Sequence, residues 1–229
     1  MKLVLVIALS VLTAVTKFDC GGGPGDGSET VLSLSCEYDY SPDCNIFPSN
    51  NYTYVGAAFD DANINFSAYF DDNLGAQYPQ NEADLYAIAE QYAQKESDGS
   101  YVYELYLVSV NTYSNSSTLG GTLGDGQSHH ALCAIFYDNI RSFASSNNPP
   151  LDQAVLRQGT VIHELGHGRG RLTHLCENTA AHNSPWEGGT CIMADNFPRP
   201  SCLEPTDKGP LDLIGFCGKC IDTLKQVSW

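Results

Sequence analysis

The chain has 229 residues and a formal net charge of −16. That length suits one domain with a hydrophobic core of useful size. The acidic balance argues against nucleic acid as a partner, because the phosphates would be repelled.

The N-terminus resembles a targeting segment. Lys2 precedes an apolar run, Leu3 to Val15, which is too short to span a membrane, and cleavage can follow at Thr16. We predict that residues 1–16 are a signal peptide and that the protein is secreted, without a transmembrane span. A buried element of the fold is the alternative for this run, and a lipid anchor at Cys20, which would hold the protein at the cell surface, is a second alternative.

Composition divides the remaining chain into two parts. The stretch 17–50 is rich in Gly, Ser, Pro and Asp, which predicts a linker or a short pro-segment. Residues 51–229 are predicted to form a single domain. The first elements expected in it are, in order, a strand from Tyr52 to Phe59, a helix from Asn81 to Lys95, a strand from Tyr101 to Val110, a loop from Asn111 to Gln127 and a strand from Ala131 to Tyr137.

Two further helices are expected in the second half. One begins near Leu151, because two prolines directly precede it and proline is tolerated at a helix start. The other runs from Leu211 to Val227, where apolar residues recur at helical spacing.

The helix that begins near Leu151 contains the motif H-E-x-x-H. His163 and His167 are four residues apart, so they share one helix face and can bind the same Zn²⁺. Glu164 follows the first histidine and suits a general base that takes a proton from a zinc-activated water.

A third zinc ligand should follow the helix. Gly170 can end the helix and turn the chain back, after which His174 can reach the metal. Thr173 precedes it, but zinc prefers His, Cys and carboxylates. We therefore expect His174 as the third ligand, with His182 or Asp195 as alternatives.

These residues resemble the metzincin peptidases, whose motif is H-E-x-x-H-x-x-G-x-x-H, with the third histidine shifted by one residue. The order of the later residues resembles the archaemetzincin type in particular, although the cysteine spacing differs. These residues are Cys176, Cys191-Ile192-Met193, and Cys217 to Cys220. In that family, Met193 would form the Met-turn beneath the zinc.

The resemblance implies an α+β metzincin-like zincin fold. Its upper lobe would contain a twisted mixed sheet and the active-site helix, and a small irregular lower lobe would end in the C-terminal helix. An edge strand, for which Ala131 to Tyr137 is the candidate, would pair with extended substrate.

The implied function is a secreted, monomeric zinc metallopeptidase that cleaves peptides or proteins. A non-catalytic zinc-binding or adhesion module on the same fold is one alternative. A zinc hydrolase that acts on another substrate class is the other.

The nine cysteines of an exported chain predict disulfides. Cys36 and Cys44 could close a small loop, and Cys133 could pair with Cys202 across the domain. The four cysteines of the resemblance have two interpretations. In the family's pattern they bind a second, structural zinc, whereas an oxidising compartment favours disulfides; they are Cys176, Cys191, Cys217 and Cys220.

Overall fold

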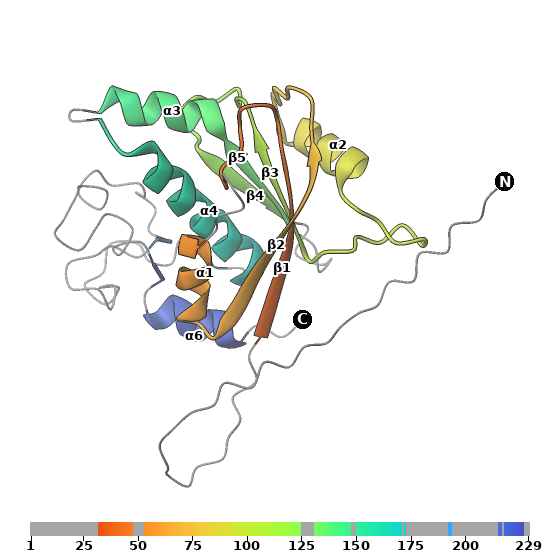
Figure 1. Ribbon diagram of the computed structural model, residues 1–229, viewed down its shortest axis with the longest axis vertical. Helices are drawn as coiled ribbons and strands as arrows, with labels where there is room; N and C mark the ends of the chain where they lie inside the picture. Colours follow the sequence, from red (N-terminus) through yellow and green to blue (C-terminus); the bar gives the residue numbers. More distant parts are fainter. Residues whose placement is uncertain are drawn as a thin grey trace, which may run out of the picture. The chain divides into compact units, whose positions relative to one another are not determined.

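A five-stranded mixed sheet with strand order β2-β1-β3-β5-β4 forms the centre of the fold (Figure 1). The computed structural model describes residues 32–47, 53–124, 131–147, 150–170, 172, 192–193, 215–216 and 218–226. The strands are β1 (Leu32–Tyr40), β2 (Ile64–Asn73), β3 (Leu105–Val110), β4 (Gly120–Gly124) and β5 (Ala131–Phe136). The helices within these residues are α1 (Thr53–Asp60), α2 (Glu82–Tyr92), α3 (Tyr137–Ser146), α4 (Gln153–Gly170) and α6 (Gly218–Gln226). The chain is therefore of mixed α+β class, as predicted.

The edge of the sheet differs from the prediction. Strands β2, β1, β3 and β5 run parallel, and β4 pairs antiparallel with β5 at the edge. The prediction that Ala131 to Tyr137 is an edge strand is wrong, because β5 lies between β3 and β4. All six residues of β5 are buried, which is typical of an interior parallel strand. Strand β4 lies in the stretch predicted as a loop, since its glycines give it low intrinsic β-propensity.

Strand β1 corrects the predicted linker. It lies in the interior of the sheet, between β2 and β3, within the stretch 17–50. Leu34, Cys36 and Tyr38 alternate along it and are fully buried on one face. The polar residues around this alternation concealed it. Residues 1–31, which include the predicted signal peptide and Cys20, lie outside the described residues.

Helix α1 replaces the predicted strand from Tyr52 to Phe59. Val55, Ala58, Phe59 and Ala62 are buried, and this spacing is that of a helix face rather than of a strand. The aromatic and β-branched composition favoured a strand, but burial follows the helical period. Strand β2 and helix α3 were not predicted.

The remaining elements agree with the sequence in type. Helix α2 begins after Asn81, whose side chain accepts a hydrogen bond from the backbone N–H of Asp84. Strands β3 and β5 and helices α4 and α6 lie within the predicted stretches or start within two residues of them.

The helices form two layers, one on each face of the sheet (Figure 1). Helices α1, α4 and α6 contribute buried residues to one apolar cluster, together with Leu34, Leu107 and Ile135. Helix α2 covers the other face and packs with Val108 and Phe136. Helix α4, which carries the H-E-x-x-H motif, therefore rests directly on the sheet.

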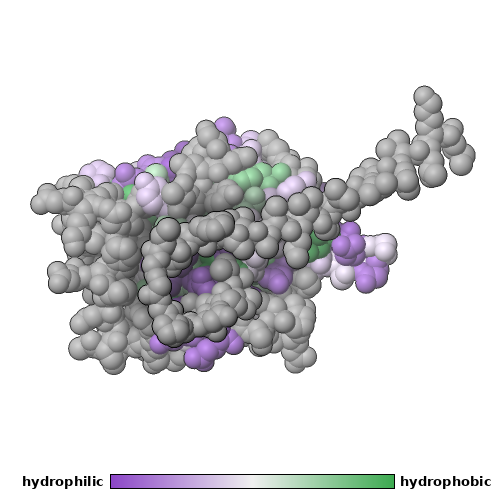
Figure 2. Space-filling model, turned by 60° about the horizontal axis from the view of Figure 1, so that its bottom comes forward, coloured by the Kyte–Doolittle hydropathy of each residue, from purple (hydrophilic) through white to green (hydrophobic). Residues whose placement is uncertain are grey.

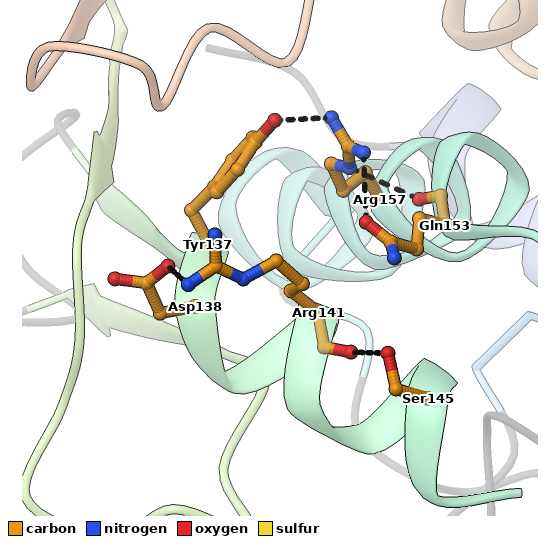
Figure 3. Close-up of polar contacts among 6 residues, drawn as sticks. All are labelled: Tyr137, Asp138, Arg141, Ser145, Gln153 and Arg157. Carbon is orange, nitrogen blue, oxygen red and sulfur yellow. Dashed lines mark hydrogen bonds and ion pairs between the residues drawn. The ribbon is translucent and has the colours of Figure 1, made fainter.

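The first half of α4 is fixed to α3 through Arg157 (Figure 3). The guanidinium donates to the hydroxyl of Tyr137 at 2.7 Å, and its Cζ lies 4.5 Å from the centre of that ring. It also donates to the backbone and side-chain oxygens of Gln153. The neighbouring Arg141–Asp138 ion pair lies on the exposed side of α3, where such pairs contribute little. The Arg157 contacts therefore join the first half of α4 to the first residue of α3.

The described surface mixes polar and apolar residues, as Figure 2 shows for one face. Four of the five large hydrophobic side chains that are exposed on the described residues are tyrosines; the five are Tyr54, Tyr69, Tyr78, Tyr86 and Val102. Within the described part of the chain, no helix has the length and apolar character needed to cross a membrane.

Candidate metal centre

The two histidines of the motif face each other across one turn of α4. The Nε2 atoms of His163 and His167 lie 3.1 Å apart, and the two rings meet at 85° with their centroids 4.7 Å apart. Both side chains are partly exposed. The helical spacing therefore places the Nε2 atoms of the two rings close together.

Backbone carbonyls determine which ring nitrogens carry hydrogen. Nδ1 of His163 lies 2.6 Å from the carbonyl oxygen of Ile192. Nδ1 of His167 makes the corresponding short contact with the carbonyl oxygen of Leu172. A carbonyl only accepts hydrogen bonds, so each Nδ1 must be the donor. In the neutral rings, the lone pairs are then on the two Nε2 atoms, which point at each other.

This arrangement fits a zinc ion. Two nitrogens at ~2.0–2.1 Å from a tetrahedral zinc lie ~3.3 Å apart, close to the Nε2–Nε2 separation here. Backbone acceptors on the second nitrogen of each ring are the usual outer partners of zinc-binding histidines. His163 and His167 would therefore supply two zinc–nitrogen bonds.

Glu164 lies directly after His163 on α4 and is 6% exposed. Its Oε2 accepts a hydrogen bond from the hydroxyl of Thr122 on β4, at 2.8 Å. Burial raises the pKa of Glu164 to about 7, and the Thr122 hydrogen bond lowers it partly. A carboxyl group with a pKa in this range can take up and release a proton near neutral pH.

Close packing from the sheet surrounds Glu164. A Cβ added to Gly120 would lie 2.8 Å from Glu164 Oε1 and 2.9 Å from its Cγ, so only glycine leaves room for the carboxylate. Below the helix, the buried thiol of Cys133 on β5 contacts the Glu164 carbonyl oxygen at 3.4 Å. The sheet therefore holds both the side chain and the backbone of this residue.

The segment around Met193 packs beneath the helix. Met193 is fully buried, and a Cβ added to Gly166 would lie 2.7 Å from its sulfur and 2.9 Å from Phe216 Cε1. The backbone N–H of Ile192 donates to the carbonyl oxygen of Gly215. Through its carbonyl oxygen, Ile192 thus connects this buried turn to His163.

The other predicted ligands lie outside the described residues. These are His174, its alternatives His182 and Asp195, and the cysteines Cys176, Cys191 and Cys217. Among the residues that the structure does describe, no group of three or more His, Cys, Asp or Glu is placed to hold a metal ion. The described part of the site thus consists of two ligands and the adjacent acid.

The described cysteines correct two expected disulfides. Cys36 and Cys44 are buried and are not joined, because β1 carries the chain away from Cys36 before it turns toward Cys44. Cys133 is likewise a free cysteine, buried under α4 with its sulfur 3.0 Å from where a Gly168 Cβ would be, and its expected partner Cys202 lies outside the described residues. Cys220 is buried on α6 and takes part in no disulfide with a described cysteine.

Sequence reasoning missed Thr122 and Gly120. Both lie in a Ser/Thr/Gly-rich stretch that predicts a loop, and nothing in their spacing from the motif marks them. Leu172, just beyond the end of α4, is buried in the core at 5% exposure. Its carbonyl oxygen has the additional role of orienting His167.

Comparisons with known proteins give only remote likenesses. No protein-family model and no curated protein matches the chain. Similar solved structures include metalloproteinase-II from Bacteroides fragilis, at 9% identity and a TM-score of 0.46, covering 88% of this chain and 55% of that one. A zinc-dependent peptidase from Methanocorpusculum labreanum has 14% identity and a TM-score of 0.43, and the match covers 82% of this chain and 99% of that one.

A structure described as a chaperone–substrate complex has 10% identity and a TM-score of 0.46, covering 85% of this chain. The chain spans 34% of the length of that structure and 55% of that of the B. fragilis protein. At these TM-scores the likenesses carry no weight, and the functional interpretation rests on the geometry of the site.

Proposed function

We propose that this protein is a zinc-dependent metallopeptidase of metzincin-like type. The observation that carries the proposal is the pair of imidazole Nε2 atoms 3.1 Å apart, each ring oriented by a backbone carbonyl, with a buried carboxyl group on the adjacent residue. Two histidines oriented in this way are suited to bind one metal cation between them.

His163 and His167 would hold the zinc, and His174 would complete the ligand set, with His182 or Asp195 as alternatives. Bound zinc would lower the pKa of a water molecule and polarise the scissile carbonyl. Glu164 would take the proton of the attacking water and pass it to the departing amine. Burial of this carboxyl group raises its pKa to about 7, so that it can take up and release a proton near neutral pH.

The remaining parts of the proposal follow from the sequence. Met193 is the residue of the Met-turn, and its burial against Gly166 and Phe216 supports this assignment. Residues 1–16 direct secretion, the substrate is a peptide or protein, and the chain acts as a monomer. The cysteines Cys176, Cys191, Cys217 and Cys220 form disulfides or bind a second, structural zinc.

Metal analysis and one substitution test this function. The purified protein should bind about one equivalent of zinc at the histidine site and cleave a mixed peptide library. Glu164→Gln should retain the zinc and lose cleavage by about 10²- to 10⁴-fold, because the base is gone and the ligands remain. In the same assay, His174→Ala should lose both the bound zinc and the cleavage of the peptide library. Zinc-loaded protein that leaves the whole library uncut would contradict the peptidase assignment.

Two other classes would give different results. A non-catalytic zinc-binding or adhesion module would bind zinc without cleavage, and Glu164→Gln would change nothing. A zinc hydrolase of another substrate class would spare peptides but cleave ester or amide libraries in a Glu164-dependent manner. The position of this acidic residue next to the two histidines, rather than its burial alone, favours the catalytic classes, because a structural zinc site has no use for a base there.

A further inference from the structure

Glu164 lies on a helix, but its side chain is held by the edge strand of the sheet. The Thr122 hydroxyl lies 2.8 Å from Glu164 Oε2 and 2.9 Å from the Glu164 carbonyl oxygen. It also lies 3.7 Å from the sulfur of Cys133. A hydroxyl has one hydrogen, so it donates to one of these atoms at a time.

The strength of the acceptors decides which atom receives the hydroxyl hydrogen. The Cys133 S–H is placed to donate to the Glu164 carbonyl oxygen at 3.4 Å. The Thr122 O–H is then available for Oε2, and a hydrogen bond to a carboxylate is the stronger of its two choices. Thr122 therefore fixes one oxygen of the carboxyl group, and Oε1 remains as the atom that exchanges a proton.

Gly120 prevents the carboxyl group from turning elsewhere. Its Cα packs so closely that an added Cβ would lie 2.8 Å from both Glu164 Oε1 and Thr160 Cγ2. The hydroxyl of Thr122 and the backbone of Gly120, two residues apart on the same face of β4, together restrict the position of the side chain. A base confined in this way has little reorganisation to undergo before proton transfer.

We infer that Thr122 is a positioning residue for the catalytic base: its hydroxyl holds Glu164 Oε2, so that Oε1 receives the proton of the attacking water. The inference rests on the proposed function. Thr122 is not one of the proposed zinc ligands, and it acts through Glu164.

Two variants separate the hydroxyl from the bulk of the side chain. Thr122→Val keeps the shape and removes the donor, whereas Thr122→Ser keeps the donor. On a peptide that the wild type cleaves, Thr122→Val should lower kcat by about 10- to 100-fold, with KM within about twofold, because a hydrogen bond to a charged group is lost. Thr122→Ser should restore kcat to within about threefold of the wild type.

The affinity for zinc, measured by competition with a chelator, should be the same in both variants and in the wild type. Three results would each overturn the inference. They are a Thr122→Val kcat within about twofold of the wild type, an equal loss in both variants, and a loss of zinc affinity that parallels the loss of kcat.

A measurement that needs no activity separates this inference from the proposed function. In the metal-free protein, Thr122→Val should lower the midpoint of thermal unfolding by about 2–6 °C. In the background of Glu164→Ala, the same substitution should lower it by less than half as much, because the acceptor is absent. Additive effects would refute the link between the two residues. If the two substitutions are non-additive but the wild type cleaves no peptide, the proposed peptidase function is wrong, although the hydrogen bond between Thr122 and Glu164 is confirmed.

Discussion

Each face of the sheet buries a carboxyl group that accepts a hydrogen bond from a hydroxyl, and the two groups have different surroundings. On the face covered by α2, Asp39 is fully buried and accepts from the Tyr106 hydroxyl at 2.7 Å. On the face covered by α4, Glu164 accepts from Thr122 at 2.8 Å. The distances are nearly equal, so they do not distinguish the two groups.

The difference lies in what each hydrogen bond connects. Asp39 and Tyr106 belong to neighbouring interior strands, so their contact holds β1 against β3. Glu164 and Thr122 connect the edge strand to the helix residue that lies beside His163. The burial of an acidic residue is therefore weak evidence of function, and the groups next to it decide its role.

The largest expected effect concerns the pH dependence of stability in the metal-free protein. The pKa of Glu164 is raised from 4.5 to about 7 in the folded state, so folding favours its protonated form. Its stabilising contribution is full below about pH 4.5 and is lost as the pH rises through 7. Between about pH 5 and pH 8, the wild type should lose about 2–3 kcal/mol of unfolding free energy that Glu164→Gln does not lose.

Urea unfolding with a chelator present measures this difference. Parallel pH profiles for the wild type and Glu164→Gln would show that Glu164 is not desolvated in the folded protein. The two acidic groups would then differ in burial as well as in their neighbours.

The second prediction concerns the structural carboxyl group. Tyr106→Phe removes a hydroxyl donor to Asp39 and should cost about 1.5–3 kcal/mol of unfolding free energy, because a buried carboxyl group loses this hydrogen bond. Its kcat and zinc affinity should match the wild type, in contrast to Thr122→Val. Denaturant unfolding and steady-state kinetics on the same preparation check both. A drop in kcat with unchanged stability would reverse the proposed distinction.

The smallest expected effect compares two glycines of the helical layer on the α4 side. In Gly166→Ala the new methyl group would approach the sulfur of Met193 and the ring of Phe216, at a cost of about 1–3 kcal/mol. Gly56→Ala in α1 meets no atom within 4 Å and should stabilise by about 0.5–1 kcal/mol. Urea midpoints measure both. Equal shifts of the same sign would mean that the turn at Met193 does not press against α4.

The sequence predicted elements best where local signals agreed. The helix from Asn81 had a capping residue, acidic residues in its first turn and a helical apolar period, and the structure has it. The stretch around α1 has the aromatic and β-branched composition of a strand, but its buried residues recur at helical spacing. The prediction followed the composition and was therefore wrong. Strand β4 carried no local signal at all, because its pairing with β5 forms it.

The sequence by itself determined the chemistry of the candidate centre. Four residues of separation on a helix are enough to bring His163 and His167 to one point, and the intervening Glu164 needs no tertiary information to be identified. The tertiary structure decided what orients these groups. The carbonyls of Leu172 and Ile192, the Thr122 hydroxyl and the close backbone of Gly120 reach the helix from other parts of the chain. Backbone atoms and small residues act through position alone, so their roles become visible only when the chain has folded around α4.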